Sequence, residues 1–251
     1  MTRILIINAD DLGYDPAVTR GILEAMRQGV VTSATFMVNT PFSEEAARES
    51  RGLALGLHLN LARGEPVSAA IPAEHLRDGA FDEARASHLP AEAVTQEVHA
   101  QLERFEALLG RPATHVDVHK HLHTHENVLK GLISAAKVRD LPVRSIDATM
   151  RSRLMQEDVR TNAHFVGDAG AEAWWTWERF EAQVAGLEDG ITELMCHPGY
   201  TPTHVRSGYA SQREVERATL TDPRARDVLE RKGVTLGDWS HLSSTRRPFG
   251  R

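Results

Sequence analysis

Residues 4–29 read ILIINADDLGYDPAVTRGILEAMRQG. The first four residues, Ile4 to Ile7, are all branched apolar residues, which predicts a buried strand. Asp15 and Pro16 then supply an N-cap and a proline for the first turn of a helix. Apolar residues recur at helical spacing from there to Gly29, where the helix is expected to end. This stretch therefore predicts a strand followed directly by a helix, with two aspartates at the end of the strand.

The same alternation continues along the chain. Further strands are predicted over residues 30–38, 53–61, 115–123, 141–146 and 191–196. Helices are predicted over residues 90–109, 126–138 and 175–187, with shorter ones beginning at Ser43, at Ser211 in a capping box with Glu214, and at Asp222. Alternating strands and helices indicate a parallel α/β sheet covered by helices. For 251 residues we expect one domain over 1–251, a single βα barrel, TIM-like and regular or irregular in outline, with a doubly wound open sheet as the alternative.

The composition argues against several classes of partner and location. A formal net charge of −6 argues against a nucleic-acid partner. The single cysteine, Cys196, cannot form an intramolecular disulfide and suits a reducing compartment. The N-terminus lacks the features of a signal peptide, and no apolar run approaches the roughly 20 residues that span a bilayer. We therefore expect a cytoplasmic protein without a membrane span.

Polar residues gather where predicted strands end. The first strand runs into Asn8-Ala9-Asp10-Asp11, a later one carries His58 and Asn60, and another ends in Cys196-His197-Pro198-Gly199. Functional groups of parallel α/β folds lie at the carboxyl ends of strands. These clusters are therefore expected to form one site at that edge of the sheet.

The densest cluster is HVDVHKHLH, residues 115–123. Alternate residues of a strand share a face, so the odd positions line up: His115, Asp117, His119, His121 and His123. A strand is not expected to run so far, and we expect three of the five to converge. Imidazole and carboxylate together suit zinc and related divalent ions, and Asp117 could accept a hydrogen bond from a metal-bound histidine.

Each cluster taken alone has a plainer interpretation. His58 could be a hydrogen-bonded core histidine, Asp10 and Asp11 could cap a turn, and the histidine run could be a solvated strand edge. The coincidence of all clusters at strand ends favours a metal site. Asp10 and Asp11 can share that site only if the chain turns there, and Gly13 makes a turn plausible.

Seven segments together resemble the YdjC-like family of carbohydrate deacetylases, which is related to chitooligosaccharide deacetylases. They are ILIINADDLGYD (4–15), GVVTSATFMVN (29–39), GLHLNL (56–61), THVDVHKHLH (114–123), LPVRS (141–145), MCHPGY (195–200) and TDPRARDVLERKGVTLGDW (221–239). The resemblance covers nearly the whole chain and implies a βα barrel. It also implies a hydrolase that removes an acetyl group from an N-acetylated sugar.

The resemblance further implies roles for individual residues. Asp11, His58 and His119 would hold one divalent metal ion, Mg²⁺ or Zn²⁺. Asp10 would be the base and His197 the acid. Arg144 is expected to orient Asp10 or to bind substrate, with a purely structural ion pair as the alternative. The supporting or substrate-binding set is completed by three residues of the histidine run: Asp117, His121 and His123.

Two rival functions remain open at this stage. A metal-dependent phosphoesterase on a similar barrel would use histidine-rich strand ends too, often with two metals. A non-catalytic metal- or sugar-binding protein would keep binding without turnover. The region from Arg151 to Trp177 matches nothing identifiable, and its tryptophans, Trp174, Trp175 and Trp177, could stack on a sugar or pack in the core. For the oligomeric state we expect a homodimer.

Overall fold

Strand β1 (Arg3–Leu12) is the central strand of a curled parallel sheet in the computed structural model, which describes residues 2–242. The sheet order is β6-β3-β2-β1-β8-β7, and β9 pairs with β1 beside that path. The other strands are β2 (Ser33–Phe36), β3 (Leu55–Leu59), β6 (Val116–Val118), β7 (His164–Val166), β8 (Gly190–Cys196) and β9 (Thr235–Gly237). The expected single domain over 1–251 includes residue 1 and residues 243–251, which lie outside the described part.

The length of β1 explains its three partners. Residues Arg3 to Ala9 pair with all of β8, whereas the other edge is shared: Ile4 to Ile6 pair with β9, and Asn8 to Leu12 pair with β2. Most of β1 is buried on both faces, as the apolar run from Ile4 to Ile7 predicts for a parallel strand covered by helices.

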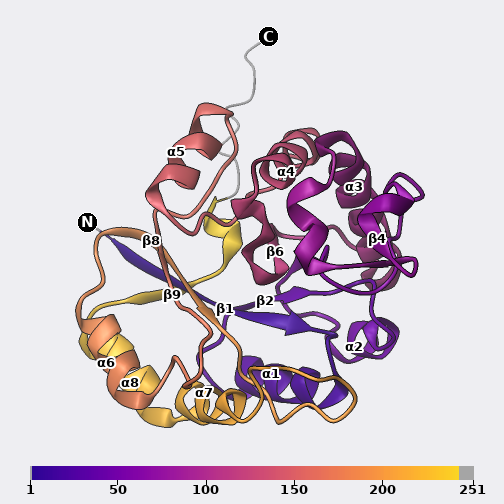
Figure 1. Cartoon of the computed structure of the whole chain (residues 1–251). Coiled ribbons are helices and arrows are strands. Elements are labelled where there is room, and N and C mark those ends of the chain that lie inside the picture. Colours follow the sequence, from indigo (N-terminus) through magenta and orange to yellow (C-terminus); the bar gives the residue numbers. More distant parts are fainter. Residues whose placement is uncertain (1, 243–251) are drawn as a thin grey trace.

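Helices surround this sheet (Figure 1). They are α1 (Pro16–Gln28), α2 (Ser43–Glu49), α3 (Ala91–Leu109), α4 (Glu126–Arg139), α5 (Ala148–Gln156), α6 (Trp177–Ala185), α7 (Gln212–Thr221) and α8 (Pro223–Arg231). Helix α3 packs against α4, α1 against α7, and α6 against α8. None of the helices within residues 2–242 is long and apolar enough to cross a membrane.

The expected TIM-like barrel is met only in part. The fold is α/β with a curled parallel sheet, but the predicted strand over 141–146 is reduced to a single bridge between Val143 and Val116. Pro142 has no N–H to donate, so only isolated backbone bonds form there: Val116 donates to Pro142, Arg144 donates to Val116, and Val143 donates to Arg160. The complete, regular ring of eight strand–helix units does not appear among the described residues.

Helix ends test the predicted caps. The prediction at α1 is confirmed, because the Asp15 side chain accepts a hydrogen bond from Ala17 N at 2.8 Å and Pro16 follows it. The predicted capping box before α7 is wrong. Ser211 has helical backbone angles and forms no side-chain cap, and Glu214 instead accepts a hydrogen bond from Thr201.

The stretch with no identifiable match, 151–177, contains most of α5 and all of β7. Its Trp175 is 1% exposed and donates its indole N–H to the carbonyl of Met195 at 2.7 Å, so this ring is part of the packing. Arg179 lies over Trp174 and Arg224 over Trp177. The sugar platform suggested for this cluster is therefore wrong for Trp175, and the other two rings are covered by arginines.

Residues 63–88, between β3 and α3, contain short elements. They are the 3₁₀ turns η1 (Ala73–His75) and η2 (Glu83–His88) and a two-residue hairpin of β4 (Leu76–Arg77) and β5 (Ala80–Phe81). Two further 3₁₀ segments, η3 (His119–Thr124) and η4 (Trp239–Leu242), follow strands β6 and β9. Segment η3 carries the second half of the histidine run.

Candidate functional site

Two adjacent aspartates at the end of β1 reach the same site because the backbone turns between them. Asp11 has φ = 74°, in the left-handed region, and the register of β1 against β2 shifts between Ala9 and Leu12. Such a conformation costs about 1–3 kcal/mol in a residue other than glycine, although aspartate tolerates it better than most. The turn expected near Gly13 therefore begins at Asp11 itself, and a bulge in the strand creates it.

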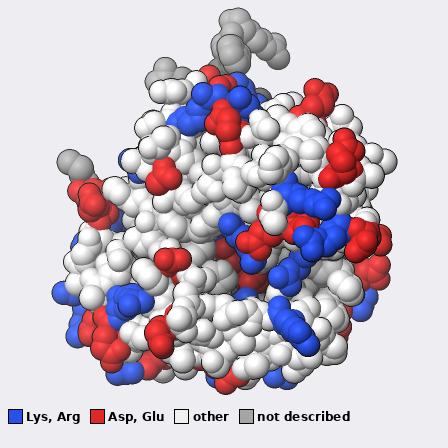
Figure 2. Space-filling model, viewed as in Figure 1, with Lys and Arg blue, Asp and Glu red and all other residues white. Residues whose placement is uncertain are grey.

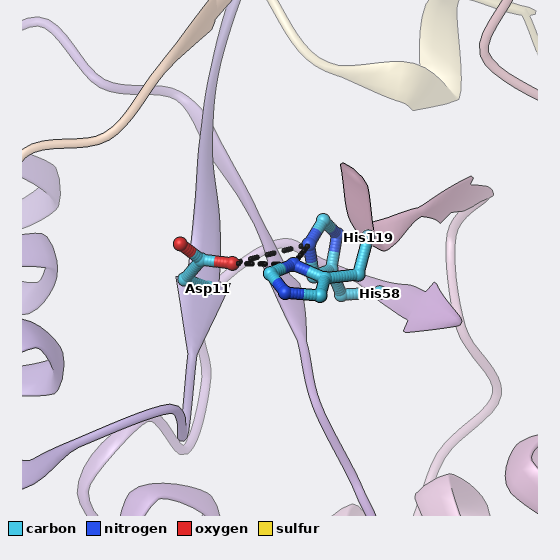
Figure 3. Close-up of side chains that lie close together, drawn as sticks. All are labelled: Asp11, His58 and His119. Carbon is cyan, nitrogen blue, oxygen red and sulfur yellow. Dashed lines mark hydrogen bonds and ion pairs between the residues drawn. The ribbon is translucent and has the colours of Figure 1, made fainter. Parts of the chain in front are cut away.

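Asp11, His58 and His119 bring three ligand atoms together (Figure 3). Asp11 Oδ1 lies 3.2 Å from His58 Nε2 and 3.1 Å from His119 Nδ1, and the two nitrogens are 3.1 Å apart. Ligand bonds of about 2.0–2.2 Å to one ion put neighbouring ligand atoms roughly 2.8–3.6 Å apart. All three side chains are buried, so this group could bind a metal ion.

His58 is held in the orientation that such a role needs. Its Nδ1 lies 2.6 Å from Asp117 Oδ1, so Nδ1 carries the proton and Nε2 faces His119 and Asp11. Thr35 donates its hydroxyl to the other Asp117 oxygen at 2.9 Å. Burial lowers the pKa of His58, but the surrounding carboxylates, Asp117 above all, outweigh burial and raise it to about 10.

Asp10 forms a bidentate ion pair with Arg144. The guanidinium donates from Nη1 to Asp10 Oδ2 and from Nη2 to Asp10 Oδ1, both at 2.7 Å, and Arg144 also bonds Asp117 and Glu193 at 2.8 and 2.7 Å. Burial raises the pKa of Asp10, but Arg144 outweighs it and holds this pKa well below its usual range. Burial also raises the pKa of Glu193, to about 7. Arg144 is fully buried and holds both oxygens of Asp10 in place.

The site opens into a cavity of about 570 Å³. Asp10, Asp11, His58, His119, His121 and His197 all line it. Figure 2 shows acidic side chains recessed in a hollow near the centre of the molecule, with basic side chains beside it. A volume of this size suits a small ligand such as a mono- or disaccharide.

The remaining members of the histidine run separate after the strand. Lys120 and His121 have φ = 56° and 52°, so the alternation of a strand ends at His119. His121 turns into the cavity, whereas His123 is buried beside it with ring centroids 5.8 Å apart. His115 packs inside the fold in a stack on Trp239 with ring centroids 4.2 Å apart.

His197 follows β8 and is half-buried at the cavity wall. Its Nδ1 has no hydrogen-bond partner within residues 2–242, and its backbone N–H donates to Glu216. Burial lowers the pKa of this ring to about 4, although Asp11 and Asp10 act in the opposite direction. His197 is therefore a neutral imidazole at pH 7, with one ring nitrogen available to a ligand.

Three buried charged residues of the site escaped the sequence reasoning. Glu193 could have been found, because it is the one charged residue inside the apolar strand β8. Arg213 and Glu216 could not, since they occupy ordinary positions on the amphipathic helix α7. In the fold, Arg213 Nη2 lies 2.6 Å from Asp11 Oδ2, and Glu216 accepts hydrogen bonds from Tyr209 and from the His197 backbone.

Comparison with known proteins finds relatives that match nearly the whole chain. The family described as YdjC-like protein matches residues 4–231. A carbohydrate deacetylase of Geobacillus stearothermophilus is 38% identical over 94% of this chain and 96% of its own length. A chitooligosaccharide deacetylase of Serratia marcescens is 34% identical over 96% and 100%.

A solved structure matches equally broadly. It belongs to an Enterococcus faecalis protein named for cleavage of cellobiose phosphate, and it is 29% identical with a TM-score of 0.85. The match covers 97% of this chain and 100% of the other. Sequence motifs, fold and relatives coincide over almost the entire length, and the chain belongs to the YdjC-like protein family.

Proposed function

We propose that this protein removes the acetyl group from an N-acetylated sugar by metal-assisted hydrolysis. The observation that carries the proposal is the convergence of Asp11 Oδ1, His58 Nε2 and His119 Nδ1 to within 3.1–3.2 Å in a cavity that Asp10 and His197 also line. Relatives named carbohydrate deacetylase and chitooligosaccharide deacetylase support the same reaction.

The residues present suit a divalent ion such as Zn²⁺ or Mg²⁺. Asp11, His58 and His119 would hold it, and the bond from His58 Nδ1 to Asp117 would keep His58 Nε2 directed at it. When bound, the ion supplies Lewis acidity that acidifies water and stabilises negative charge on the acetyl oxygen. One carboxylate and two imidazoles form the three-ligand set of a single-metal site.

Asp10 and His197 would move the protons. Asp10 stays ionised because Arg144 binds both of its oxygens, and we assign it the role of drawing the proton from the attacking water. His197 is neutral at pH 7, so it can protonate the leaving nitrogen only after it takes up a proton, and the proton that Asp10 draws from the attacking water balances that uptake. Water then adds to the acetyl carbon, the C–N bond breaks, and acetate and the amino sugar leave.

Acetate release from N-acetylglucosamine and its β-1,4-linked disaccharide tests the proposal. The metal-free protein should be inactive, and reloading it with Zn²⁺, Mg²⁺, Co²⁺ or Mn²⁺ should restore activity with at least one ion. His119→Ala should lose both the metal and the activity, whereas His88→Ala, at an exposed position with no part in the site, should keep both. Metal-loaded protein that releases acetate from neither sugar nor from a wider N-acetylated panel would overturn the deacetylase assignment.

Metal binding should release a proton and tighten with pH. Free His58 is protonated at pH 7, since its pKa is raised to about 10, and it must lose that proton to bind an ion. Between pH 6 and pH 8 the affinity for Zn²⁺ should therefore rise about tenfold per pH unit. Calorimetry in two buffers of different ionisation enthalpy should count about one proton released.

The matched variant for this measurement is Asp117→Asn. It removes the carboxylate that most strongly raises the pKa of His58, so fewer protons should be released and the pH dependence should flatten. Zinc binding with no proton release in the unmodified protein would contradict the charge state assigned to His58.

A further inference from the structure

Arg213 is a buried cation beside a metal-ligand candidate. It lies at the start of α7, is 2% exposed, and lines the cavity. Its Nε donates to the Tyr209 carbonyl at 2.9 Å, and its Nη2 donates to Asp11 Oδ2 at 2.6 Å. The rings of Tyr14 and Tyr209 flank the guanidinium, with centroids 5.8 and 5.9 Å from its carbon. The guanidinium is thus fixed in orientation before any ligand arrives.

Because of this contact, the two carboxylate oxygens of Asp11 have different partners. Oδ1 faces His58 and His119, and Oδ2 is taken by Arg213. A carboxylate held in this way offers one oxygen to an ion and cannot swing to offer both. Arg213 therefore sets how Asp11 is presented to its neighbours.

One donor of the guanidinium is left over. Nη1 of Arg213 is buried and has no hydrogen-bond partner in the part of the chain that the structure describes. An unpaired charged donor in a buried site is costly, and a cation next to metal ligands repels the metal. Structural support for Asp11 needs only Nη2, so it does not account for Nη1.

We infer that Arg213 Nη1 donates a hydrogen bond to the acetyl oxygen of the substrate, while Nη2 holds Asp11. Nη1 and Nη2 share one carbon, so the contact of Nη2 with Asp11 Oδ2 also fixes the position of Nη1. A guanidinium matches the negative charge that develops on that acetyl oxygen during hydrolysis. The inference rests on the proposed deacetylase function for its catalytic part, and the product acetate offers the same oxygen chemistry without turnover.

Arg213→Met tests the inference in the zinc-loaded protein, with Arg217→Met as its matched control. Arg217 lies one turn further along α7, pairs with Glu24 and does not line the cavity. In Arg213→Met, kcat for the N-acetylglucosamine disaccharide should fall about 10²–10³-fold with a smaller change in KM, as for the loss of one oxyanion donor. Arg217→Met should keep both constants within about twofold of the unmodified protein.

Two readouts separate this role from a structural one. Zinc should bind Arg213→Met at least as tightly as the unmodified protein, because a repelling cation is gone. Acetate, titrated against each zinc-loaded protein by NMR, should bind Arg213→Met at least tenfold more weakly and Arg217→Met normally. Arg213→Lys should remain defective in acetate binding. An ammonium group that pairs with Asp11 leaves no second donor at the position of Nη1 to bind the acetate oxygen.

The outcomes are distinct. Equal acetate affinity in Arg213→Met and the unmodified protein, or loss of zinc binding in Arg213→Met, would overturn the inference. If the unmodified protein hydrolyses no N-acetylated sugar while acetate binding still depends on Arg213, the proposed function fails and the donor role of Arg213 stands.

Discussion

Asp10→Asn is expected to lower kcat for acetate release by about 10²–10⁴-fold while the protein retains its metal. The side chain of Asp10 lies in the cavity wall but outside the Asp11–His58–His119 group, so the amide removes a proton acceptor without removing a ligand of that group. The amide has nearly the same shape as the carboxylate, and Asn8 still has an oxygen to bond. The loss should therefore appear in kcat and leave zinc content unchanged.

Two measurements accompany this variant. Zinc per chain and the melting temperature of the zinc-loaded protein show whether the site is still assembled, because the introduced amide would pair less well with Arg144 than the carboxylate does. Asp222→Asn changes a half-buried aspartate that caps α8 and pairs with Arg224, away from the cavity; asparagine is also a good N-cap, so this control should keep full activity. Turnover within tenfold of the unmodified enzyme at full zinc content would exclude Asp10 as the base.

Arg144→Met is expected to lower the free energy of unfolding by about 3–5 kcal/mol. The guanidinium is fully buried and bonds three buried carboxylates, from Asp10, Asp117 and Glu193. Methionine keeps much of the volume but leaves those charges without their cation. Urea unfolding of the metal-free protein at pH 7 measures the difference, with Arg224→Met as control, because exposed pairs contribute about 0–1 kcal/mol.

The stability loss in Arg144→Met should depend on pH. Without Arg144 the buried carboxylates have pKa values above those of the unfolded chain, so they destabilise the fold at neutral pH and less as they become protonated. The deficit of Arg144→Met should therefore shrink as the pH falls from 7 toward 5. Adding Glu193→Gln should restore part of the stability at pH 7. A deficit no larger than that of Arg224→Met would show that the cluster is not held by charge pairing.

The sequence predicted the order of the central elements because their signals are local. The apolar run before Asp10, the Asp15-Pro16 cap and the apolar stripe to Gly29 each depend on neighbours within a few residues, and β1 and α1 lie where these signals place them. The strand predicted over 141–146 was wrong because that prediction also used local signals alone. Its residues favour a strand, but Pro142 and the lack of a continuous partner leave only one bridge there.

The sequence by itself thus determined an α/β chain with aspartates and histidines at the ends of its strands, and its resemblance to the YdjC-like family brought Asp11, His58 and His119 forward as a group. Only the tertiary structure decided how they meet: the left-handed turn at Asp11 redirects one carboxylate, and two more left-handed residues after His119 send His121 and His123 to different places. It alone brought in Arg213, which is 202 positions from Asp11 in the chain. Spacing along a strand or helix fixes which side chains share a face, but contacts between distant segments depend on how the whole sheet curls and packs.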